Sequence, residues 1–386
     1  MFCRNLYSSR FFFQSFSSLS CVHFHRGKYL NFIRYASGKH LKSSKSTKKK
    51  PYNEFAKKNH FKAYGNSYIN DSASADIIAS HLCEDWKEGY IFECNPGPGM
   101  LSESILKLKI PHLRVFEKNE KFLPQLKVLS TEYDNFEIVE KDFLFLPNLT
   151  AKRLYHDTCD DLDEFFNGIP KIPWENGVPF RLFSIIHSSH SIKFSRYLLA
   201  GLANKAFIFS HGRCEFFFFM KQSEYLSMFA EPKSNFKMYR WSTVLYKVFF
   251  DIKFLYKDEE NSFYLVKLTP RSDLFSSLVN DNRLQDFYYF IWHHFFRRTD
   301  FVIPVLEKYV PLCGTRLIEE GMNAFVRFGY LSPEQLLRLF NQFSSWPEYE
   351  ESIFHFTAKS FFKEFTFVDE EEEEEESDFM LNHQIK

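Results

Sequence analysis

The sequence has 386 residues, of which 45% are hydrophobic and 19% aromatic, and its formal net charge is zero. This length suits one large or two ordinary domains with a substantial core. The apolar run Phe216 to Met220 is far too short to span a membrane, and seven cysteines without close pairing argue against a disulfide framework.

The first fifty residues differ in composition from the rest of the chain. Residues 1–50 contain no aspartate or glutamate, and they carry eleven lysines and arginines among many serines and phenylalanines. This composition is typical of a mitochondrial presequence. Arg34 to Ser37 resembles a matrix-protease site, and cleavage near residue 36 would leave residues 39–50 as a basic tail. The alternative is a disordered basic arm that binds nucleic acid.

A helix is the first element predicted after this region. Asp71 or Ser72 supplies an N-cap oxygen. The side chains that recur at the spacing of one helical face are Ile77, Ile78 and Leu82.

A glycine loop follows the first predicted strand. Residues 91–94 form an apolar run, Asn95 to Gly99 follow it, and a helical pattern extends from Leu101 to Lys109. This order predicts a strand, a tight turn and a helix. Gly97 and Gly99 leave the backbone bare, so a ligand can approach main-chain amides at the start of the helix. Many turns contain Gly-x-Gly without binding a ligand, and the loop alone leaves both interpretations open.

Two acids after the loop indicate what kind of ligand it would bind. Glu117 ends a second predicted strand about 20 residues after the loop, where doubly wound folds place the carboxylate that binds ribose hydroxyls. A third strand leads into Asp142 and Phe143, which are suited to accept from an adenine amino group and to lie on the ring. Ser102 replaces the third glycine of the dinucleotide fingerprint, so no pyrophosphate cradle is expected. The spacing predicts an adenosine site, and S-adenosyl-L-methionine is the cofactor that fits it.

These motifs resemble those of the rRNA adenine N6-dimethyltransferase family. The resemblance is carried by Glu93 to Gly99, Glu117 and Lys141 to Phe143, preceded by Tyr64 to Asp71. Asn95 stands where the bacterial enzymes keep glycine, as in the mitochondrial branch of the family. Three further segments resemble that branch, namely 171–174, 212–215 and 268–275. The resemblance covers roughly residues 60–345.

The resemblance implies a Rossmann-like α/β methyltransferase fold with a small C-terminal helical domain. It also implies binding of S-adenosyl-L-methionine, with Ser67 and Ile69 at the methionine end. The predicted cofactor-binding residues are Ile69, Glu93, Asn95, Gly97, Gly99, Glu117, Asp142 and Phe143. The expected domains are a presequence and basic tail at 1–50, a methyltransferase domain at 51–270, a helical domain at 271–365 and an acidic disordered tail at 366–386.

The repeated strand and helix units imply a parallel sheet with both faces covered. The helix after Glu117 is expected at residues 119–129. Residues 151–170 contain five acids and are expected to form a solvated acidic insertion.

The predicted strand Phe180 to Ile186 leads into the segment with the greatest functional consequence. In the family this strand ends in Asn-Leu-Pro-Tyr, which accepts from the target adenine's amino group and stacks on the flipped base. The corresponding residues here are Ile185, Ile186, His187 and Ser188. Isoleucine cannot accept a hydrogen bond and serine cannot stack, so no catalytic residue is assigned and methyl transfer is expected to be impaired.

The second half is predicted to add strands and then helices. The strands are expected at 206–209, 214–220, 252–256 and 263–268. The helices are expected at 284–296, 302–310 and 334–343, the last with Ser332 and Pro333 as cap and first turn. The resemblance implies that these helices complete a cleft with the sheet and that nucleic acid lies in it.

Two charged segments are candidates for contact with nucleic acid or for its control. Trp292 to Arg298 mixes aromatic and cationic side chains, as single-strand binding surfaces do, and the predicted contacts are Trp292, Arg297 and Arg298. The alternative is a structural stripe. The unbroken run Glu370 to Glu376 predicts a disordered tail. It is either a solubilising end or a mobile element that competes with DNA for basic surfaces.

Two other kinds of site are not expected. His187 with His190, and His293 with His294, lack partners at metal-ligand spacing. The sequence has no Gly-x-x-x-x-Gly-Lys loop, so hydrolysis of nucleoside triphosphates is not predicted.

Two functions of different class follow from the resemblance. One is a mitochondrial transcription initiation factor of the matrix nucleoid, which works with the mitochondrial RNA polymerase, melts promoter DNA and holds its single strands. The other is an S-adenosyl-L-methionine-dependent dimethyltransferase of adenines in mitochondrial small-subunit rRNA. The loss of the Asn-Leu-Pro-Tyr element favours the first, in which the cofactor site is either retained or a relic.

Overall fold

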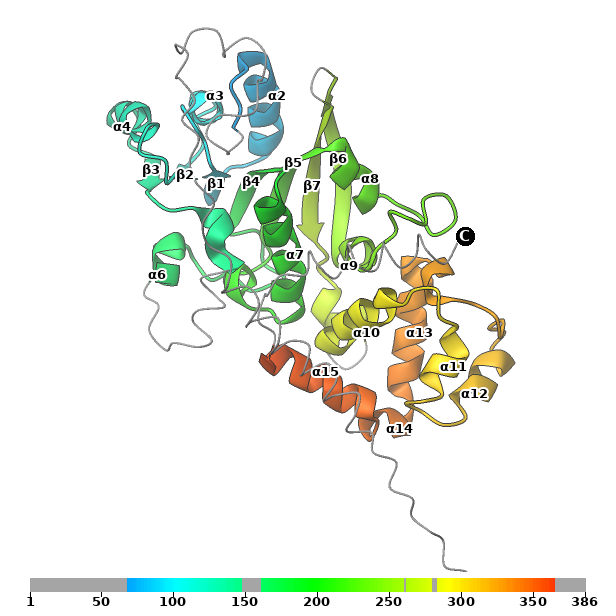
Figure 1. Cartoon of the computed structure of the whole chain (residues 1–386). Helices are drawn as coiled ribbons and strands as arrows, with labels where there is room; N and C mark the ends of the chain where they lie inside the picture. The colour runs from blue at the N-terminus through cyan, green and yellow to red at the C-terminus, as the bar shows by residue number, and fades with distance from the viewer. Residues whose placement is uncertain (1–67, 148–160, 260–261, 280–282, 365–386) are drawn as a thin grey trace, which may run out of the picture. The chain divides into compact units, whose positions relative to one another are not determined.

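A seven-stranded sheet with the order β3-β2-β1-β4-β5-β7-β6 is the frame of the fold (Figure 1). The strands are β1 Tyr90–Cys94, β2 His112–Phe116, β3 Phe136–Val139, β4 Phe180–Ile186, β5 Glu215–Lys221, β6 Phe250–Asp258 and β7 Phe263–Pro270. The first five run parallel, and β7 is antiparallel to both of its neighbours. This doubly wound arrangement confirms the predicted Rossmann-like methyltransferase fold.

The computed structural model describes residues 68–147, 161–259, 262–279 and 283–364. These residues belong to one unit, which spans residues 57–386. The presequence, the basic tail, Ser67 and the acidic tail lie outside the described residues, as do Asp157 and Asp160. Among the helices of the described part, none is long and apolar enough to cross a membrane.

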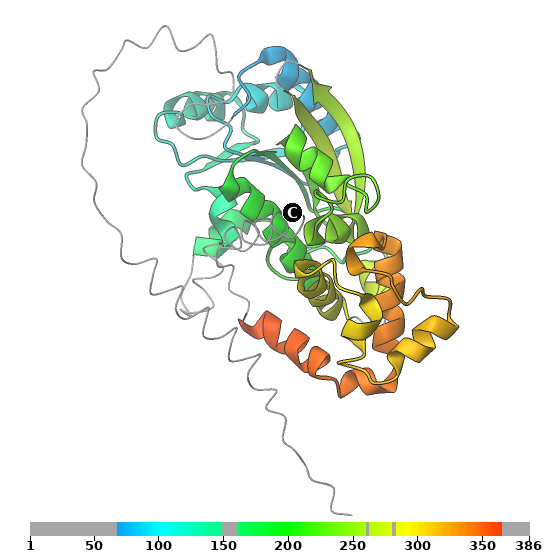
Figure 2. The ribbon, with the colours of Figure 1, turned by 45° about the vertical axis from the view of Figure 1, so that its right-hand side comes forward.

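Helices cover both faces of the sheet, as Figure 2 shows. Those of the first part are α2 Ser72–Cys83, α3 Met100–Lys107, α4 Leu123–Glu132, α6 Asp161–Phe166, α7 Ser189–Ala203, α8 Gln222–Met228 and α9 Trp241–Phe249. Those that follow β7 are α10 Leu284–Phe296, α11 Val302–Leu306, α12 Cys313–Glu319, α13 Pro333–Ser345, α14 Pro347–Glu350 and α15 Ile353–Glu364. The predicted bounds of β4 and α10 are confirmed, and so are the caps Asp71 of α2 and Ser332 of α13.

The phenylalanine run in β5 shows how the core is divided. Phe216 and Phe218 belong to the core cluster that contains residues of α7, α9 and α10. Phe217 and Phe219 point to the opposite face, into the cluster that contains residues of α2 and α3. Successive side chains of a strand point to opposite faces, so a strand covered on both sides is apolar throughout.

The helices after β7 share the first of these core clusters. α10 contacts α7 and α9, α13 contacts α9 and α10, and α15 contacts α10. Phe287, Tyr288, Tyr289, Phe290 and Phe295 of α10 are therefore buried against the sheet half of the molecule as well as among the later helices, whereas Phe296 is exposed. The domain boundary at residue 270 stays a prediction.

The predicted strand at residues 206–209 is wrong, because Phe207–His211 forms a 3-10 helix. Lys205 and Phe207 have positive φ values of 49° and 56°, which an extended strand does not allow. Ile208 and Phe209 are nevertheless buried. A short apolar run shows that a segment is buried, and it does not distinguish a strand from a helical turn.

Two predictions in the first part are also corrected. Residues 161–166 form α6, in which Phe165 is fully buried and Glu164 is exposed, so this part of the expected insertion is anchored to the core by its apolar side chain. Arg114 holds it by donating to the carbonyl oxygens of Phe165 (3.1 Å) and Asn167 (2.6 Å). The helix expected from residue 119 begins at Leu123, and the Asn119 N–H is bound by the carboxylate of Glu117.

A buried ion cluster ties the start of β5 to neighbouring elements. The Glu215 carboxylate accepts from Arg181 of β4 (2.8 Å) and Lys267 of β7 (2.6 Å). Arg181 also donates to the carbonyl oxygens of Leu82 and Glu84 at the end of α2, both at 2.7 Å. Burial alone would raise the pKa of Glu215, but the Lys267 and Arg181 charges outweigh it and lower that pKa.

We predict that Glu215→Gln destabilises the fold by about 3 kcal/mol, because it leaves two cations of this cluster without their carboxylate. A depressed carboxyl pKa contributes stability above the unfolded-state value and loses it as the pH falls through the folded-state value. Urea unfolding of the wild type should therefore show a loss of stability below about pH 4.5 that the variant lacks. Equal unfolding free energies at neutral pH would contradict the assignment.

His294 of α10 lies between two parallel rings. Its imidazole stacks on Phe328 at 4.3 Å and on Phe354 of α15 at 5.7 Å, with interplanar angles of 6° and 8°. Burial, with a smaller contribution from His293, holds the pKa of His294 well below its usual range. The neutral ring therefore acts as a flat apolar contact between α10 and α15.

We predict that His294→Phe flattens the pH dependence of stability between pH 6.5 and 5. A histidine with a lowered folded-state pKa binds its proton in the unfolded chain, so stability falls below about pH 6.5 by up to about 1.4 kcal/mol per pH unit. Urea unfolding at several pH values measures this slope in both proteins. Identical slopes would show that His294 is not neutral in the folded state.

Candidate functional site

The loop after β1 has an unusual backbone conformation. Asn95, Gly97 and Gly99 all have positive φ values, of 55°, 60° and 90°. Asparagine tolerates this region better than other side chains, and glycine adopts it freely. A Cβ atom on Gly99 would lie 2.9 Å from a methyl carbon of Leu126, so a side chain here would require that leucine to shift. α3 begins directly after Gly99.

Glu117 lies beside this loop, at the end of β2. Its two carboxylate oxygens accept from the N–H groups of Gly97 (3.1 Å) and Asn119 (2.8 Å). The residue is buried, and burial raises its pKa while these hydrogen bonds oppose the rise. The structure therefore brings the predicted ribose-binding acid and the glycine loop together at the edge where β1 lies between β2 and β4. Open α/β sheets bind ligands at such reversals of strand order.

Glu93 lies below the loop and is bound by Ser102 of α3. The Ser102 hydroxyl donates to the Glu93 carboxylate at 2.6 Å, and both side chains are buried. Burial raises the pKa of Glu93 to about 8, with the Ser102 hydrogen bond acting in the opposite direction and Glu117 adding to the rise. Near neutral pH the carboxyl is mostly protonated. Ser102 stands where a dinucleotide-binding loop would have glycine. Its hydrogen bond to Glu93 could not be predicted from the sequence.

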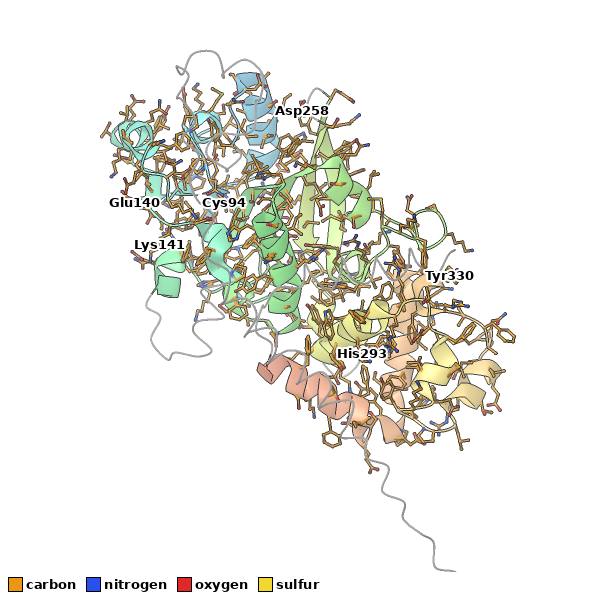
Figure 3. All side chains as sticks on the ribbon, in the orientation of Figure 1. Cys94, Glu140, Lys141, Asp258, His293 and Tyr330 are labelled. Atoms are coloured by element: carbon orange, nitrogen blue, oxygen red, sulfur yellow. The ribbon has the colours of Figure 1, made fainter. Side chains whose placement is uncertain are left out.

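Asp142 follows β3, and the structure gives it partners that the sequence analysis missed. Its Oδ2 atom lies 2.9 Å from Lys118 Nζ and 3.8 Å from His190 Nε2, while its Oδ1 atom accepts from the Leu144 N–H (3.1 Å). Lys118 could have been suspected, since it directly follows Glu117, but no signal pointed to His190. Figure 3 labels Cys94, the last residue of β1, and Lys141, the residue before Asp142. An adenine amino group would compete with Lys118 for Asp142.

The predicted stacking of adenine on Phe143 is corrected. Phe143 is fully buried. Its ring packs against Phe116 (4.6 Å), Phe165 (5.5 Å), Phe194 (5.8 Å) and Phe92 (5.9 Å). No face of this ring is left for a ligand, because the side chain joins the core between the sheet and α7.

The segment before α2 covers the loop. Ile69 is buried with the α2 and α3 side chains, so it supports the site from the core. Tyr68, which the sequence analysis did not single out, lies on Gly97, where a Cβ atom would be 2.4 Å from the Tyr68 ring. Among the described residues, the side-chain oxygens of Asn70 and Asn95 are buried acceptors without a hydrogen-bond partner. An ammonium donor such as that of an S-adenosyl-L-methionine amino-acid group fits this set.

The end of β4 offers different polar groups, the buried Ser184 hydroxyl and the His187 imidazole. Ile185 and Ile186 are buried. Ser188 is the N-cap of α7, and the Ser191 hydroxyl oxygen accepts from the N–H groups of His187 (3.0 Å) and Ser188 (3.1 Å). In the segment where the family would bind a target base, the serine hydroxyl groups instead form hydrogen bonds that cap α7.

The three predicted nucleic-acid contacts do not form one surface. Trp292 is half-buried and packs against Phe361 of α15 (4.7 Å). Arg297 is exposed just after α10. Arg298 extends toward the connection between α8 and α9, where it lies 4.8 Å from the centre of the Phe236 ring. Within the described ranges, no group of histidine, cysteine, aspartate and glutamate could hold a metal ion.

Curated relatives share much of the length of this chain. The dimethyladenosine transferase 2, mitochondrial, of Drosophila melanogaster is 25% identical over 357 residues, covering 74% of this chain and 77% of that protein. The protein of that name from Rattus norvegicus is 29% identical over 244 residues, covering 56% and 61%. The solved structure of the 23S rRNA methyltransferase ErmE aligns with a TM-score of 0.48 and 16% identity, covering 72% of this chain and all of that one.

A family model matches the chain from before α2 to the end of α13. It is the model for ribosomal RNA adenine dimethylase, and it spans residues 57–345. The match includes the glycine loop, both strand-end acids and the segment after β4. The chain therefore belongs to the ribosomal RNA adenine dimethylase family.

Proposed function

We propose that this protein is a mitochondrial transcription initiation factor built on a dimethylase fold. It joins the mitochondrial RNA polymerase, helps to melt promoter DNA and holds the unpaired strand in the matrix nucleoid. The mitochondrial location is supported by the names of the relatives and by the acid-free first fifty residues. The resemblance to the mitochondrial branch of the family supports the role in transcription.

The end of β4 is the observation that carries this proposal. Dimethylation of adenine requires groups that accept from the amino nitrogen and a ring that stacks on the base. Here the side chains are those of two buried isoleucines, a histidine and a serine that caps α7. Their chemistry supports a protein that no longer positions an adenine for attack.

Holding a single strand requires no reaction. Melting DNA costs roughly 1.4 kcal/mol of stacking per base-pair step. A factor that binds only the unpaired strand shifts the opening equilibrium by its preference for that strand over the duplex. Stacking and phosphate contacts supply such a preference.

The second candidate is an S-adenosyl-L-methionine-dependent dimethyltransferase of mitochondrial small-subunit rRNA. It is favoured by the cofactor half of the site, where Glu117 lies against the glycine loop and Asn70 and Asn95 offer buried acceptors. Cofactor binding would depend on the glycine loop, whereas methyl transfer would also depend on the end of β4. The protein could therefore bind the cofactor without transferring a methyl group.

We predict that Glu117→Ala weakens binding of S-adenosyl-L-methionine about tenfold or more, because hydrogen bonds to a charged group contribute about 1.5 to 3 kcal/mol. Isothermal calorimetry on the full chain measures it, with the exposed Glu120→Ala as a control. Equal affinity in the wild type and the Glu117 variant would refute the site assignment. Absence of binding to the wild type would show that the site is a relic.

We predict that the protein stimulates run-off transcription by mitochondrial RNA polymerase from a duplex promoter and that a pre-melted bubble largely removes the requirement. The stimulation should fall steeply with salt, since phosphate contacts release counterions. Purified polymerase with and without the factor on the two templates provides the measurement. Equal stimulation on both, or a requirement for S-adenosyl-L-methionine, would favour the enzyme instead.

A further inference from the structure

Three segments from different parts of the chain meet beside the end of α10. The Gly329 N–H donates to the Arg298 carbonyl oxygen at 2.7 Å, and Phe301 and Arg327 form an antiparallel bridge. Arg298 Nη1 donates to the carbonyl oxygen of Tyr239 at 3.1 Å. We call this place the three-segment junction, and it comprises residues 233–240, 297–301 and 325–330.

The first half of the junction is a stack that ends in an exposed ring. Arg298 lies over Phe236 at 4.8 Å, and the Phe236 ring lies 5.3 Å from that of Tyr330. A Cβ atom on Gly329 would lie 2.8 Å from the Phe236 ring, so this approach requires glycine. Tyr330, labelled in Figure 3, is 53% exposed.

The second half repeats this arrangement. Arg327 lies over Phe301 at 4.3 Å, and the Phe301 ring lies 6.3 Å from that of Phe325 in an edge-to-face contact. Phe325 is 78% exposed, the highest value among the large hydrophobic side chains described. Two cation–aromatic pairs therefore each support a ring that faces solvent.

The junction is also strongly basic. Its cations are Lys233, Lys237, Arg240, Arg297, Arg298 and Arg327. Asp300 is its one acid, so six positive charges minus one negative charge leave a net charge of +5 in a chain whose total is zero. Lys233, Lys237 and Arg297 are exposed. Exposed rings among cations match an unpaired nucleic-acid strand, whose bases stack and whose phosphates are negative.

We propose that the three-segment junction binds an unpaired nucleic-acid strand, with bases stacked on Tyr330 and Phe325 and phosphates held by the surrounding cations. This inference rests on the proposed function and assigns its binding surface. Trp292, which the sequence predicted to stack on bases, packs against α15. The proposal instead assigns base stacking to Tyr330 and Phe325, which no sequence motif indicated.

The test is a fluorescence anisotropy titration of the full chain with labelled oligodeoxythymidylate and, separately, oligouridylate. Tyr330→Ala and Phe325→Ala should each weaken binding by about 5-fold to 100-fold, which corresponds to one stacked base. Lys237→Ala should lower the slope of log affinity against log salt by about 1. Phe356→Ala is the matched control, because that ring is 61% exposed on α15, outside the junction, and its affinity should equal that of the wild type.

The outcomes separate the two proposals. Wild-type binding with no loss in either ring variant would overturn the junction and leave the proposed function standing. Failure of the wild type to bind either strand would overturn the proposed function. Losses confined to oligouridylate would support the junction as an RNA site and contradict its role in holding promoter DNA. Circular dichroism confirms that the variants, whose altered rings are exposed, remain folded.

Discussion

The hydrogen bond between the Gly97 N–H and the buried Glu117 carboxylate is the interaction on which the candidate site depends. β1 and β2 pair in parallel, so the loop that ends one and the acid that ends the other meet at the same edge. A carboxylate taken out of water needs donors, and the left-handed loop conformation provides one. Tyr68 then lies on Gly97, and α3 starts at Gly99. This half of the candidate site is thus built around one buried acid.

The ends of β1 and β2 and the end of β4 differ in how closely they match the residues predicted for the family. The acid and the glycines lie at the ends of β1 and β2, and Asn95 and Asn70, the latter from the segment before α2, have unsatisfied side-chain oxygens. At β4, the next strand along the same edge, the polar groups are used to start α7. Lys118 on Asp142 and the burial of Phe143 further alter the adenine end. The glycine loop and its acid thus match the predicted adenosine site, whereas the segment after β4 lacks the Asn-Leu-Pro-Tyr element.

The sequence predicted the parts of this structure that follow from local pattern. The sheet, the loop, the meeting of Glu117 with Gly97 and the caps Asp71 and Ser332 each rest on spacing or on a single capping residue. What it could not predict depends on contacts between distant segments. Phe143 matched a motif, but its environment is set by rings from β1, β2, α6 and α7. Likewise, Tyr330 and Phe325 have no local signal, because the rings that support them, Phe236 and Phe301, come from other segments.

The central claim is that this family member opens DNA by binding and not by methyl transfer. The most direct measurement places 2-aminopurine at the start site of a mitochondrial promoter and follows its fluorescence with polymerase, with and without this protein, in the absence of nucleotides. The account predicts an increase in fluorescence that requires the protein and is the same with or without S-adenosyl-L-methionine. No increase, or an increase that depends on the cofactor, would contradict it.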